Sequence, residues 1–305
     1  MGEGIGGMGG ARAADADALR HQETRIRIRR QLVRLHWVAA GPRPDHHGPL
    51  VLLHGMASSW RQWRGTLGRL GRDLPLAALD FPGFGLSGLT RRPLAASDYA
   101  DACEAWCRAN GFGRVAAVGH SFGGAVLLDW AARYPRRFRS LGLIAPAAVF
   151  HEWYTAGYRF LRWPVIGRLL VPIVVWLVST RWLGPRMYGH VVARLENLTE
   201  QEKRDLQWGF RRAREMCRAI DYYRFPHLQE HLGRIRAPVV VGWGTDDRVV
   251  PYTDAEVYLS RLPQARLVSF EACGHVPMVE QRLASDALLR DVWRAAPGGV
   301  GATAP

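Results

Sequence analysis

The stretch Gly119-His120-Ser121-Phe122-Gly123-Gly124 decides how the rest of the chain is interpreted. An apolar run over residues 114–118 precedes it, and a helical pattern over residues 125–130 follows it. Strand, glycine-flanked serine and helix is the context in which G-x-S-x-G indicates a nucleophile elbow. A side chain at either flanking glycine would collide with the neighbouring strand or helix, so glycine is required there. The stretch therefore predicts a serine hydroxyl lifted clear of a sheet at a helix N-terminus, where backbone N–H groups favour negative charge.

The segments around this stretch alternate between strand and helix patterns. Two segments with period-two alternation, 25–28 and 32–38, predict antiparallel edge strands whose arginines face solvent. Unbroken apolar runs predict the strands of a mostly parallel sheet at 49–53, 74–79, 114–118, 140–145, 237–243 and 266–270. Helices are expected after a cap at Ser58 or Ser59, from Ser97 to a stop at Gly111, and near residues 283–294. The predicted class is α/β, a mostly parallel twisted sheet with helices on both faces.

The alternation stops at about residue 147 and resumes at about residue 237. The segment between them is helical in pattern and rich in aromatic residues. We interpret it as an inserted helical cap, which divides the core into two parts. The expected organisation is a disordered leader (1–22), core (23–146), cap (147–234), core (235–296) and a tail (297–305).

Composition limits the classes of function and location. The 305 residues suit one α/β domain with an insertion or two small domains, and four cysteines are too few for a disulfide scaffold. The formal charge of +14 comes almost entirely from arginines scattered along the chain, without a nucleic-acid-binding motif. We therefore expect no nucleic-acid partner and a reducing, cytoplasmic location. The glycine-rich N-terminus has no apolar core, so it does not resemble a signal peptide.

The segment 169–180 is the candidate for membrane contact. It is uncharged, but it contains Pro172 and is much shorter than the roughly 20 residues that a span requires. A buried cap helix is the favoured interpretation, and a weak peripheral contact with the membrane is the alternative.

A serine hydroxyl becomes a useful nucleophile when a base takes its proton and a third group orients that base. In an open α/β sheet the reacting groups lie at the carboxyl ends of the strands. His275 directly follows the predicted strand 266–270, so it is the favoured base. His54 also follows a strand, but a structural histidine is expected there, and His120 lies inside the elbow with its side chain directed away from the nucleophile.

The candidate acid and the candidate oxyanion donors are predicted at the same edge of the sheet as His275. Asp246 and Asp247 come after the strand 237–243, and we favour Asp247, with Asp246 as the alternative. The order Ser…Asp…His agrees with this type of elbow. The tetrahedral intermediate needs preplaced donors, for which the backbone N–H groups of Phe122 and Met56 are the candidates.

Five motifs together resemble the α/β-hydrolase fold family over about residues 25–294. They are His54-Gly55, Asp80-x-Pro-Gly-x-Gly-x-Ser87, Gly119-His120-Ser121-Phe122-Gly123-Gly124, Gly244-x-x-Asp247-x-x-Val250-Pro251 and Gly274-His275. The resemblance implies a hydrolase similar to capped esterases, cofactor-free haloperoxidase-like enzymes or carbon–carbon bond hydrolases. Serine at the elbow argues against epoxide hydrolases and haloalkane dehalogenases, which carry aspartate there.

The leading hypothesis is an esterase that forms an acyl-enzyme on Ser121 and uses no cofactor. Its substrate is expected to be a small ester with a hydrophobic acyl or aryl group, since the cap is apolar and aromatic. The candidate pocket residues are His54, Trp153, Tyr154, Tyr158, Trp176, Trp208, Val249 and Val276. The alternatives are a carbon–carbon hydrolase or other acyl transferase with the same triad, and a ligand-binding module with little turnover. His227-Leu228-Gln229-Glu230-His231 fits an inverted zinc-peptidase pattern, but it lacks a further acidic ligand, so no metal is expected.

Overall fold

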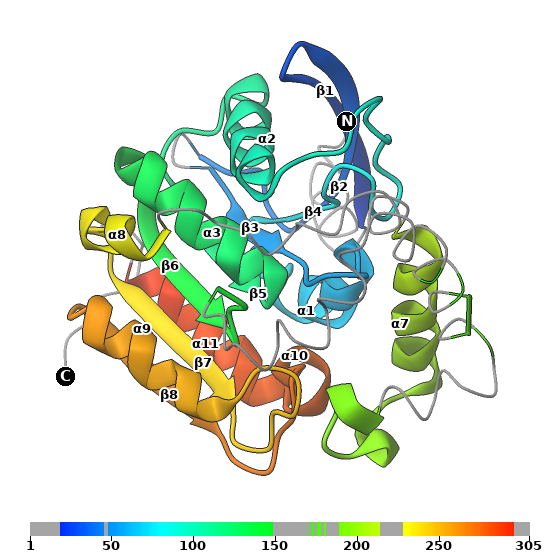
Figure 1. Ribbon diagram of the computed structural model, residues 1–305, viewed down its shortest axis with the longest axis vertical. Coiled ribbons are helices and arrows are strands. Elements are labelled where there is room, and N and C mark those ends of the chain that lie inside the picture. The colour runs from blue at the N-terminus through cyan, green and yellow to red at the C-terminus, as the bar shows by residue number, and fades with distance from the viewer. Residues whose placement is uncertain are drawn as a thin grey trace, which may run out of the picture.

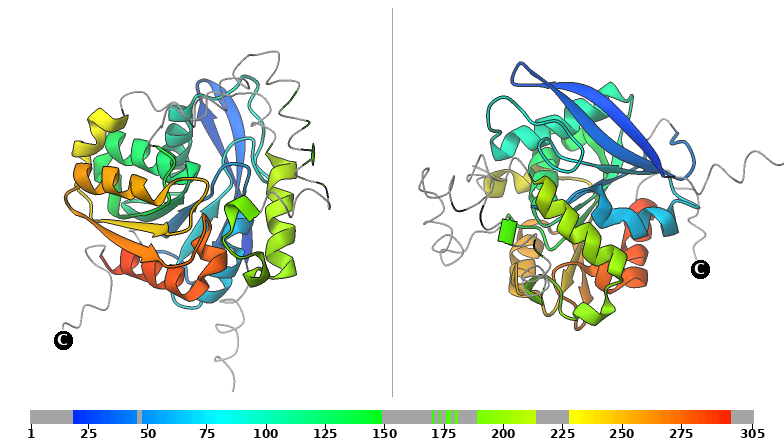
Figure 2. Two further views of the ribbon diagram at one scale, coloured as in Figure 1. Left: turned by 60° about the horizontal axis from the view of Figure 1, so that its bottom comes forward. Right: turned by 90° about the vertical axis from the view of Figure 1, so that its right-hand side faces the viewer.

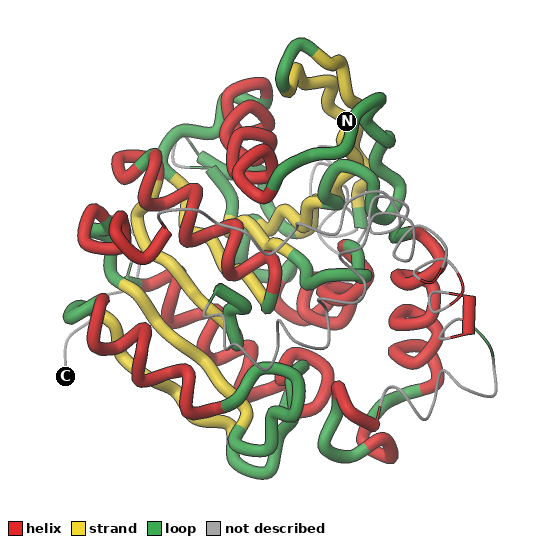
Figure 3. Tube along the Cα trace, viewed as in Figure 1, coloured by secondary structure: helices red, strands yellow, loops and turns green. Residues whose placement is uncertain are grey.

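A computed structural model describes residues 19–45, 48–148, 170, 173, 176–177, 180, 189–213 and 228–295. The strands are β1 (Arg20–Ile28), β2 (Gln31–Ala40), β3 (Leu50–Leu53), β4 (Leu76–Leu79), β5 (Val115–His120), β6 (Phe138–Ile144), β7 (Val239–Gly244) and β8 (Ala265–Phe270). They form one sheet in the order β1-β2-β4-β3-β5-β6-β7-β8, which crosses the molecule in Figure 3. All neighbouring pairs from β4 to β8 are parallel, and β2 pairs antiparallel with both β1 and β4. The predicted mostly parallel sheet is confirmed.

Helices cover both faces of this sheet. The main ones are α1 (Arg64–Leu70), α2 (Ala96–Ala109), α3 (Phe122–Arg133), α7 (Glu200–Arg212), α8 (Leu228–His231), α9 (Ala255–Arg261), α10 (Pro277–Glu280) and α11 (Arg282–Arg294), with a 3₁₀ turn η1 (Trp60–Trp63) ahead of α1. In Figure 1, α2, α3, α8 and α9 lie in front of the sheet, and α1 and α11 lie behind it. The two faces carry separate apolar cores, one centred on α3 and the other on α1 and α11.

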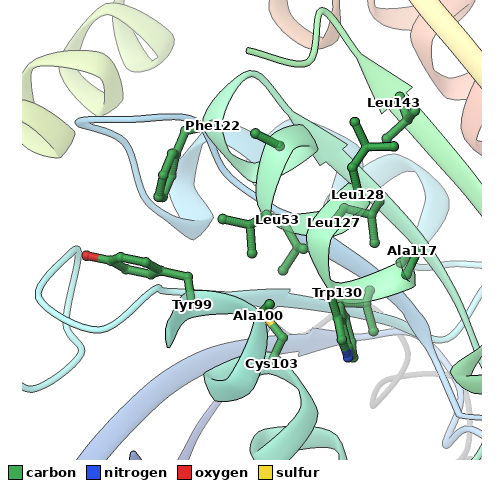
Figure 4. Packing of buried hydrophobic residues seen from close by; sticks show 14 of the residues in the cluster. Leu53, Tyr99, Ala100, Cys103, Ala117, Phe122, Leu127, Leu128, Trp130 and Leu143 are labelled. Atoms are coloured by element: carbon green, nitrogen blue, oxygen red, sulfur yellow. The ribbon is translucent and has the colours of Figure 1, made fainter. Parts of the chain in front are cut away.

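The core under α3 explains why the central strands are apolar along their whole length. β5 is buried on both faces because it lies between α3 and α11. Figure 4 shows Leu127 and Leu128 of α3 close to Ala117 and Leu143 of the sheet. The rings of Phe122 and Tyr99 meet edge-on with centroids 5.2 Å apart, which joins the start of α3 to α2.

Two predicted boundaries and one predicted strand position need correction. The leader was expected to extend to residue 22, but β1 begins at Arg20, which pairs with Ala39. The two N-terminal strands were expected at the edge, but only β1 is an edge strand, because β2 lies between β1 and β4. α2 begins before Ser97, since the Ala95 N–H donates to the Asp98 carboxylate at 2.6 Å and caps the helix there.

Residues 145–238 separate β6 from β7 in the sequence, and the part 228–234 packs on the core. α8 and the 3₁₀ turn Leu232–Arg234 pack against α3, and Leu228 and Leu232 are buried in the same apolar cluster as α3. The predicted end of the cap at residue 234 is therefore too late. α7 is the best described element of the cap, and it lies outside both helical layers (Figures 1 and 2). Within the described residues, no helix is long and apolar enough to cross a bilayer.

Candidate active site

Ser121 occupies the sharp turn between β5 and α3. Its backbone has φ +51° and ψ −116°, a strained conformation for a residue with a side chain. The Ser121 N–H donates to the carbonyl of Ile144 at 2.9 Å, which ties the turn to the end of β6. A Cβ on Gly123 would meet the His54 carbonyl oxygen at 2.5 Å, and one on Gly119 would collide with the Gly123 backbone. The predicted need for glycine on both sides of the serine is confirmed.

Residues with a strained backbone are concentrated at the carboxyl ends of the strands. Of the six described non-glycine residues with positive φ, Arg29 and Arg30 form the β1–β2 turn. The other four are Ala57, Ser121, Ala145 and Ala272, which follow β3, β5, β6 and β8. Such strain persists only where surrounding structure enforces it, and it is common at active sites.

His275 and Asp247 meet on the loops after β8 and β7. The His275 Nδ1 lies 2.7 Å from the Asp247 Oδ2, and both residues are buried. An ionised carboxylate only accepts hydrogen bonds, so Nδ1 carries the proton and Nε2 keeps its lone pair. The Val249 and Val250 N–H groups donate to the other oxygen, Oδ1, at 2.8 and 2.9 Å. The imidazole is therefore held in the tautomer that a general base requires.

The two remaining candidate histidines have structural partners. The fully buried His54 donates from Nδ1 to the Gly55 carbonyl at 2.7 Å and accepts at Nε2 from the Phe81 N–H at 3.1 Å. The buried His120 donates from Nε2 to the His275 carbonyl at 2.7 Å, so it supports the loop of the predicted base. Burial, followed by the proximity of His275, holds the pKa of His120 well below its usual value, and the ring is neutral.

The two predicted oxyanion donors belong to the turns that follow β5 and β3. Phe122 directly follows Ser121 and is the first residue of α3. Met56 follows Gly55 in the turn after β3. The Gly55 N–H donates to the Gln62 side-chain oxygen at 3.2 Å, which anchors that turn to η1. A Cβ on Gly55 would lie 3.4 Å from the Ser121 Cβ, so the turn that leads to Met56 is next to the serine, and the oxyanion site stays a prediction.

The predicted pocket residues are not all brought together. Trp153, Tyr154 and Tyr158 lie outside the described residues. Trp176 is 66% exposed, so the prediction that it lines a pocket is not supported. The Trp208 ring of α7 is partly buried and lies against the guanidinium groups of Arg61 and Arg212, at 4.2 and 5.5 Å, and its place in a pocket stays a prediction.

Val249 and Val276 flank the two triad candidates. Val249 is partly buried and bonds to Asp247, and Val276 is buried next to His275. His227 of the zinc-peptidase pattern lies outside the described residues. Within the described ranges no group of three histidine, cysteine, aspartate or glutamate residues could hold a metal ion.

One supporting carboxylate had no role assigned from the sequence. Asp80 is fully buried, and it accepts from the Trp60 N–H at 2.7 Å, the Leu86 N–H at 2.9 Å and His36 Nδ1 at 2.8 Å. It thereby joins η1 to the loop after β4. The glycine-rich motif after Asp80 was the available signal, because a Cβ on Gly85 would collide with this carboxylate.

Comparison with known proteins identifies relatives with hydrolase names. A family model described as "Alpha/beta hydrolase family" matches residues 50–286. The chain is 27% identical to 2-hydroxy-6-oxo-2,4-heptadienoate hydrolase of Pseudomonas putida over 277 residues, which cover 84% of this chain and 91% of that protein. It is 25% identical to monoacylglycerol lipase abhd6-B of Xenopus laevis over 264 residues, 82% of this chain and 76% of that protein.

A solved structure gives the same fold. A thermophilic esterase from Thermogutta terrifontis superposes with a TM-score of 0.73 at 19% identity, covering 90% of this chain and 99% of that one. At this level of identity the likeness concerns the fold alone. The fold of this chain is therefore shared with a protein of solved structure.

Proposed function

Because the chain belongs to the alpha/beta hydrolase family, we propose that it is a serine hydrolase of carboxylic esters with a hydrophobic acyl or aryl group. The observation that carries the proposal is the 2.7 Å hydrogen bond between His275 Nδ1 and Asp247 Oδ2. It leaves Nε2 free to act as a base at the edge of the sheet where Ser121 is held in its strained turn.

In the proposed reaction, the Ser121 Oγ attacks the ester carbonyl carbon while His275 Nε2 takes the hydroxyl proton. The negative charge that develops on the carbonyl oxygen is stabilised by the Phe122 and Met56 N–H groups. The carbon–oxygen bond to the alcohol then breaks, and His275 returns the proton to the leaving alcohol. Water, deprotonated by His275, attacks the acyl-enzyme and releases the acid and the free serine.

The proposal includes a hydrophobic substrate and a reducing, cytoplasmic location. Support for the substrate comes from the relative named as a monoacylglycerol lipase, because a monoacylglycerol is an ester of a fatty acid. Support for the location comes from Cys103, Cys107 and Cys273, which are free thiols in buried positions.

A second candidate reaction is hydrolysis of a carbon–carbon bond by the same residues. The relative from Pseudomonas putida favours it, since its named substrate is a keto acid rather than an ester. The two candidates share the nucleophile and the base, but they differ in the bond that is broken and in the leaving group, which is an alcohol in the first reaction and a carbon fragment that must be protonated in the second.

Turnover of p-nitrophenyl esters tests the proposal. Ser121→Ala is expected to lower kcat by at least about 10⁴-fold, because the residual rate would come from binding and the oxyanion donors alone. Ser140→Ala is the matched control, since Ser140 is also buried but bonds to the Val292 carbonyl on α11. Ester turnover that survives in Ser121→Ala would refute the assignment, and a preference for dienoate keto acids over esters would favour the second reaction.

A further inference from the structure

The loop that carries His275 has its backbone polar groups bound to two other parts of the chain. The His275 N–H donates to the Val191 carbonyl at 2.8 Å, and its carbonyl accepts from His120. Val191 lies in the cap, 84 residues earlier in the chain. The predicted base is therefore attached directly to the cap segment that returns toward the core.

Glu280, in α10, accepts hydrogen bonds both from this cap segment and from the loop that carries His275, at the junction where the two meet. Its Oε2 accepts from the Ala193 N–H of the cap at 2.7 Å and from the Gly274 N–H of the loop at 3.1 Å. Its Oε1 accepts from the Val276 N–H at 3.3 Å. One carboxylate thus binds the residues immediately before and after His275 together with the cap.

The junction is buried and closely packed. Glu280 is 8% exposed, and the neighbouring Val192 of the cap is buried in the core cluster with Val276. A Cβ on Gly274 would approach the Ala193 nitrogen to 2.6 Å and the Val191 oxygen to 2.9 Å, so the loop and the cap segment are in direct backbone contact. A buried carboxylate in such a place is retained only if its hydrogen bonds compensate for the loss of water.

We propose that Glu280 is a positioning residue, whose carboxylate couples the placement of the cap segment Val191–Ala193 to the placement of the His275 imidazole. The inference rests on the proposed function, because it assigns a role toward the base of that reaction. It predicts that a displacement of the cap segment also displaces the His275 imidazole. The rate of the chemical step then falls, while the affinity for substrate changes little.

Glu280→Gln is the direct test. The amide has one acceptor oxygen, so its NH₂ group faces at least one of the three backbone N–H donors, and the loop must shift to relieve that conflict. A displacement of about 1 Å can cost on the order of 10²-fold in rate, so we expect kcat per titrated active site to fall about 10- to 100-fold, with KM changing by less than about threefold.

Asp286→Asn is the matched control. Asp286 is similarly buried, at 6% exposure, and lies in the next helix, but its carboxylate bonds to Arg69 rather than to the His275 loop. Its variant is expected to lose stability and to keep kcat per active site within about twofold of the parent. The downfield proton signal of the His275 Nδ1–H should shift in Glu280→Gln and stay in place in Asp286→Asn.

Glu280→Asp extends the test if the glutamine variant does not fold. Aspartate keeps the charge but is one methylene shorter, so it cannot reach the loop and the cap together, and a smaller fall in kcat is expected. A kcat per active site equal to that of the parent in whichever of the two variants folds would overturn the inference. A parent protein without reaction at Ser121 would instead refute the proposed function, so the two failures are distinguishable.

Discussion

Asp247 and Asp246 are adjacent in sequence and differ sharply in environment. Asp247 is buried and receives three hydrogen bonds, from His275 and from the N–H groups of Val249 and Val250. Asp246 is exposed. Sequence reasoning placed both carboxylates after β7 and favoured Asp247, but it left Asp246 open as the alternative, because the choice depends on how the turn after Gly244 directs each side chain.

This difference predicts unequal effects for two conservative substitutions. Asp247→Asn should lower kcat by on the order of 10⁴-fold, because an amide can hold the imidazole in the wrong tautomer. Asp246→Asn should change kcat by less than about threefold, since an exposed carboxylate contributes little to the base. Steady-state kinetics on a p-nitrophenyl ester measure both. Equal losses in the two variants would contradict the assignment of Asp247.

The partners of His54 and His120 were predictable only in part. Their positions at the ends of β3 and β5 followed from the apolar runs before them. Their partners, the Phe81 N–H and the His275 carbonyl, come from loops 27 and 155 residues away. Such contacts depend on the closed fold, which no local pattern specifies.

At the scale of elements, α7 is attached to the turn that carries Met56. Asp205 accepts from Arg61 at 3.0 Å and from Arg64 at 2.7 Å, which fixes α7 against η1 and α1. One turn further along α7, Gly209 packs so closely that a Cβ would meet the Ala57 carbonyl oxygen at 2.7 Å. The position of this cap helix and the shape of the predicted oxyanion turn are therefore interdependent.

Gly209→Ala tests that interdependence. The added methyl group must push α7 or the Ala57 backbone away, so we expect ester turnover to fall about 10-fold or more. Gly68→Ala is the control, because a Cβ at this position in α1 meets nothing within 4 Å, and alanine favours a helix by up to about 1 kcal/mol. Unchanged kinetics in Gly209→Ala, with the fold intact, would show that α7 does not influence the turn.

The strands were predictable and the element ends were less so. The unbroken apolar runs located the central strands because a parallel strand is buried on both faces. The start of α2 was missed because its cap is made by the Asp98 side chain bonding back to Ala95, and Ala95 itself has no capping group. The first strand was predicted to begin at residue 25, but β1 begins at Arg20. Its first residues, Arg20, His21 and Gln22, are polar and are ordered by pairing with β2.

At the scale of the whole molecule, Glu104 joins α2, α3 and the 3₁₀ turn Pro135–Arg137, on the face of the sheet that α3 covers. It lies in α2 and accepts from Arg137 at 2.6 Å, from Arg108 at 2.7 Å and from Trp130 of α3 at 3.0 Å. Burial alone would raise the pKa of its carboxyl group, but the hydrogen bonds from Arg137, Trp130 and Arg108 lower it to about 2.

This lowered pKa predicts how the stability of the fold depends on pH. A carboxyl group with a depressed pKa in the folded state stabilises the fold above its unfolded pKa and loses that contribution as pH falls through its folded pKa. Glu104→Gln should therefore cost about 2–3 kcal/mol of unfolding free energy at neutral pH. The difference from the parent should shrink between about pH 4.5 and pH 2. Urea unfolding at several pH values measures it, and a difference independent of pH would contradict the prediction.

Weak contact with a membrane through the cap is a further proposal at this scale. Leu170, Ile173 and Trp176 each have helical backbone, lie three residues apart in the sequence and are exposed, at 42%, 51% and 66%. The arginine-rich chain would add attraction to anionic lipids. Ile173→Ser with Trp176→Ser should reduce co-sedimentation with anionic vesicles severalfold. Leu32→Ser is the control, since Leu32 is equally exposed, at 65%, in the β1–β2 hairpin, and an equal loss in that variant would contradict the proposal.

The net charge and the fold were accessible from the sequence, because they depend on composition and on the spacing of apolar runs. The attachment of the cap was not. Its bonds join Ala193 to Glu280, 87 residues apart, and Arg61 to Asp205, 144 residues apart. A charged residue has many alternative partners in an arginine-rich chain, and only the packed structure selects among them.

The central claim is that Ser121 is a nucleophile activated by His275. Reaction of the folded protein with a fluorophosphonate probe, followed by sequencing of the labelled peptide, tests it most directly. We predict one labelled site per chain, located at Ser121, with labelling strongly reduced in His275→Ala. Labelling at another serine, or a protein that does not react while correctly folded, would contradict the claim.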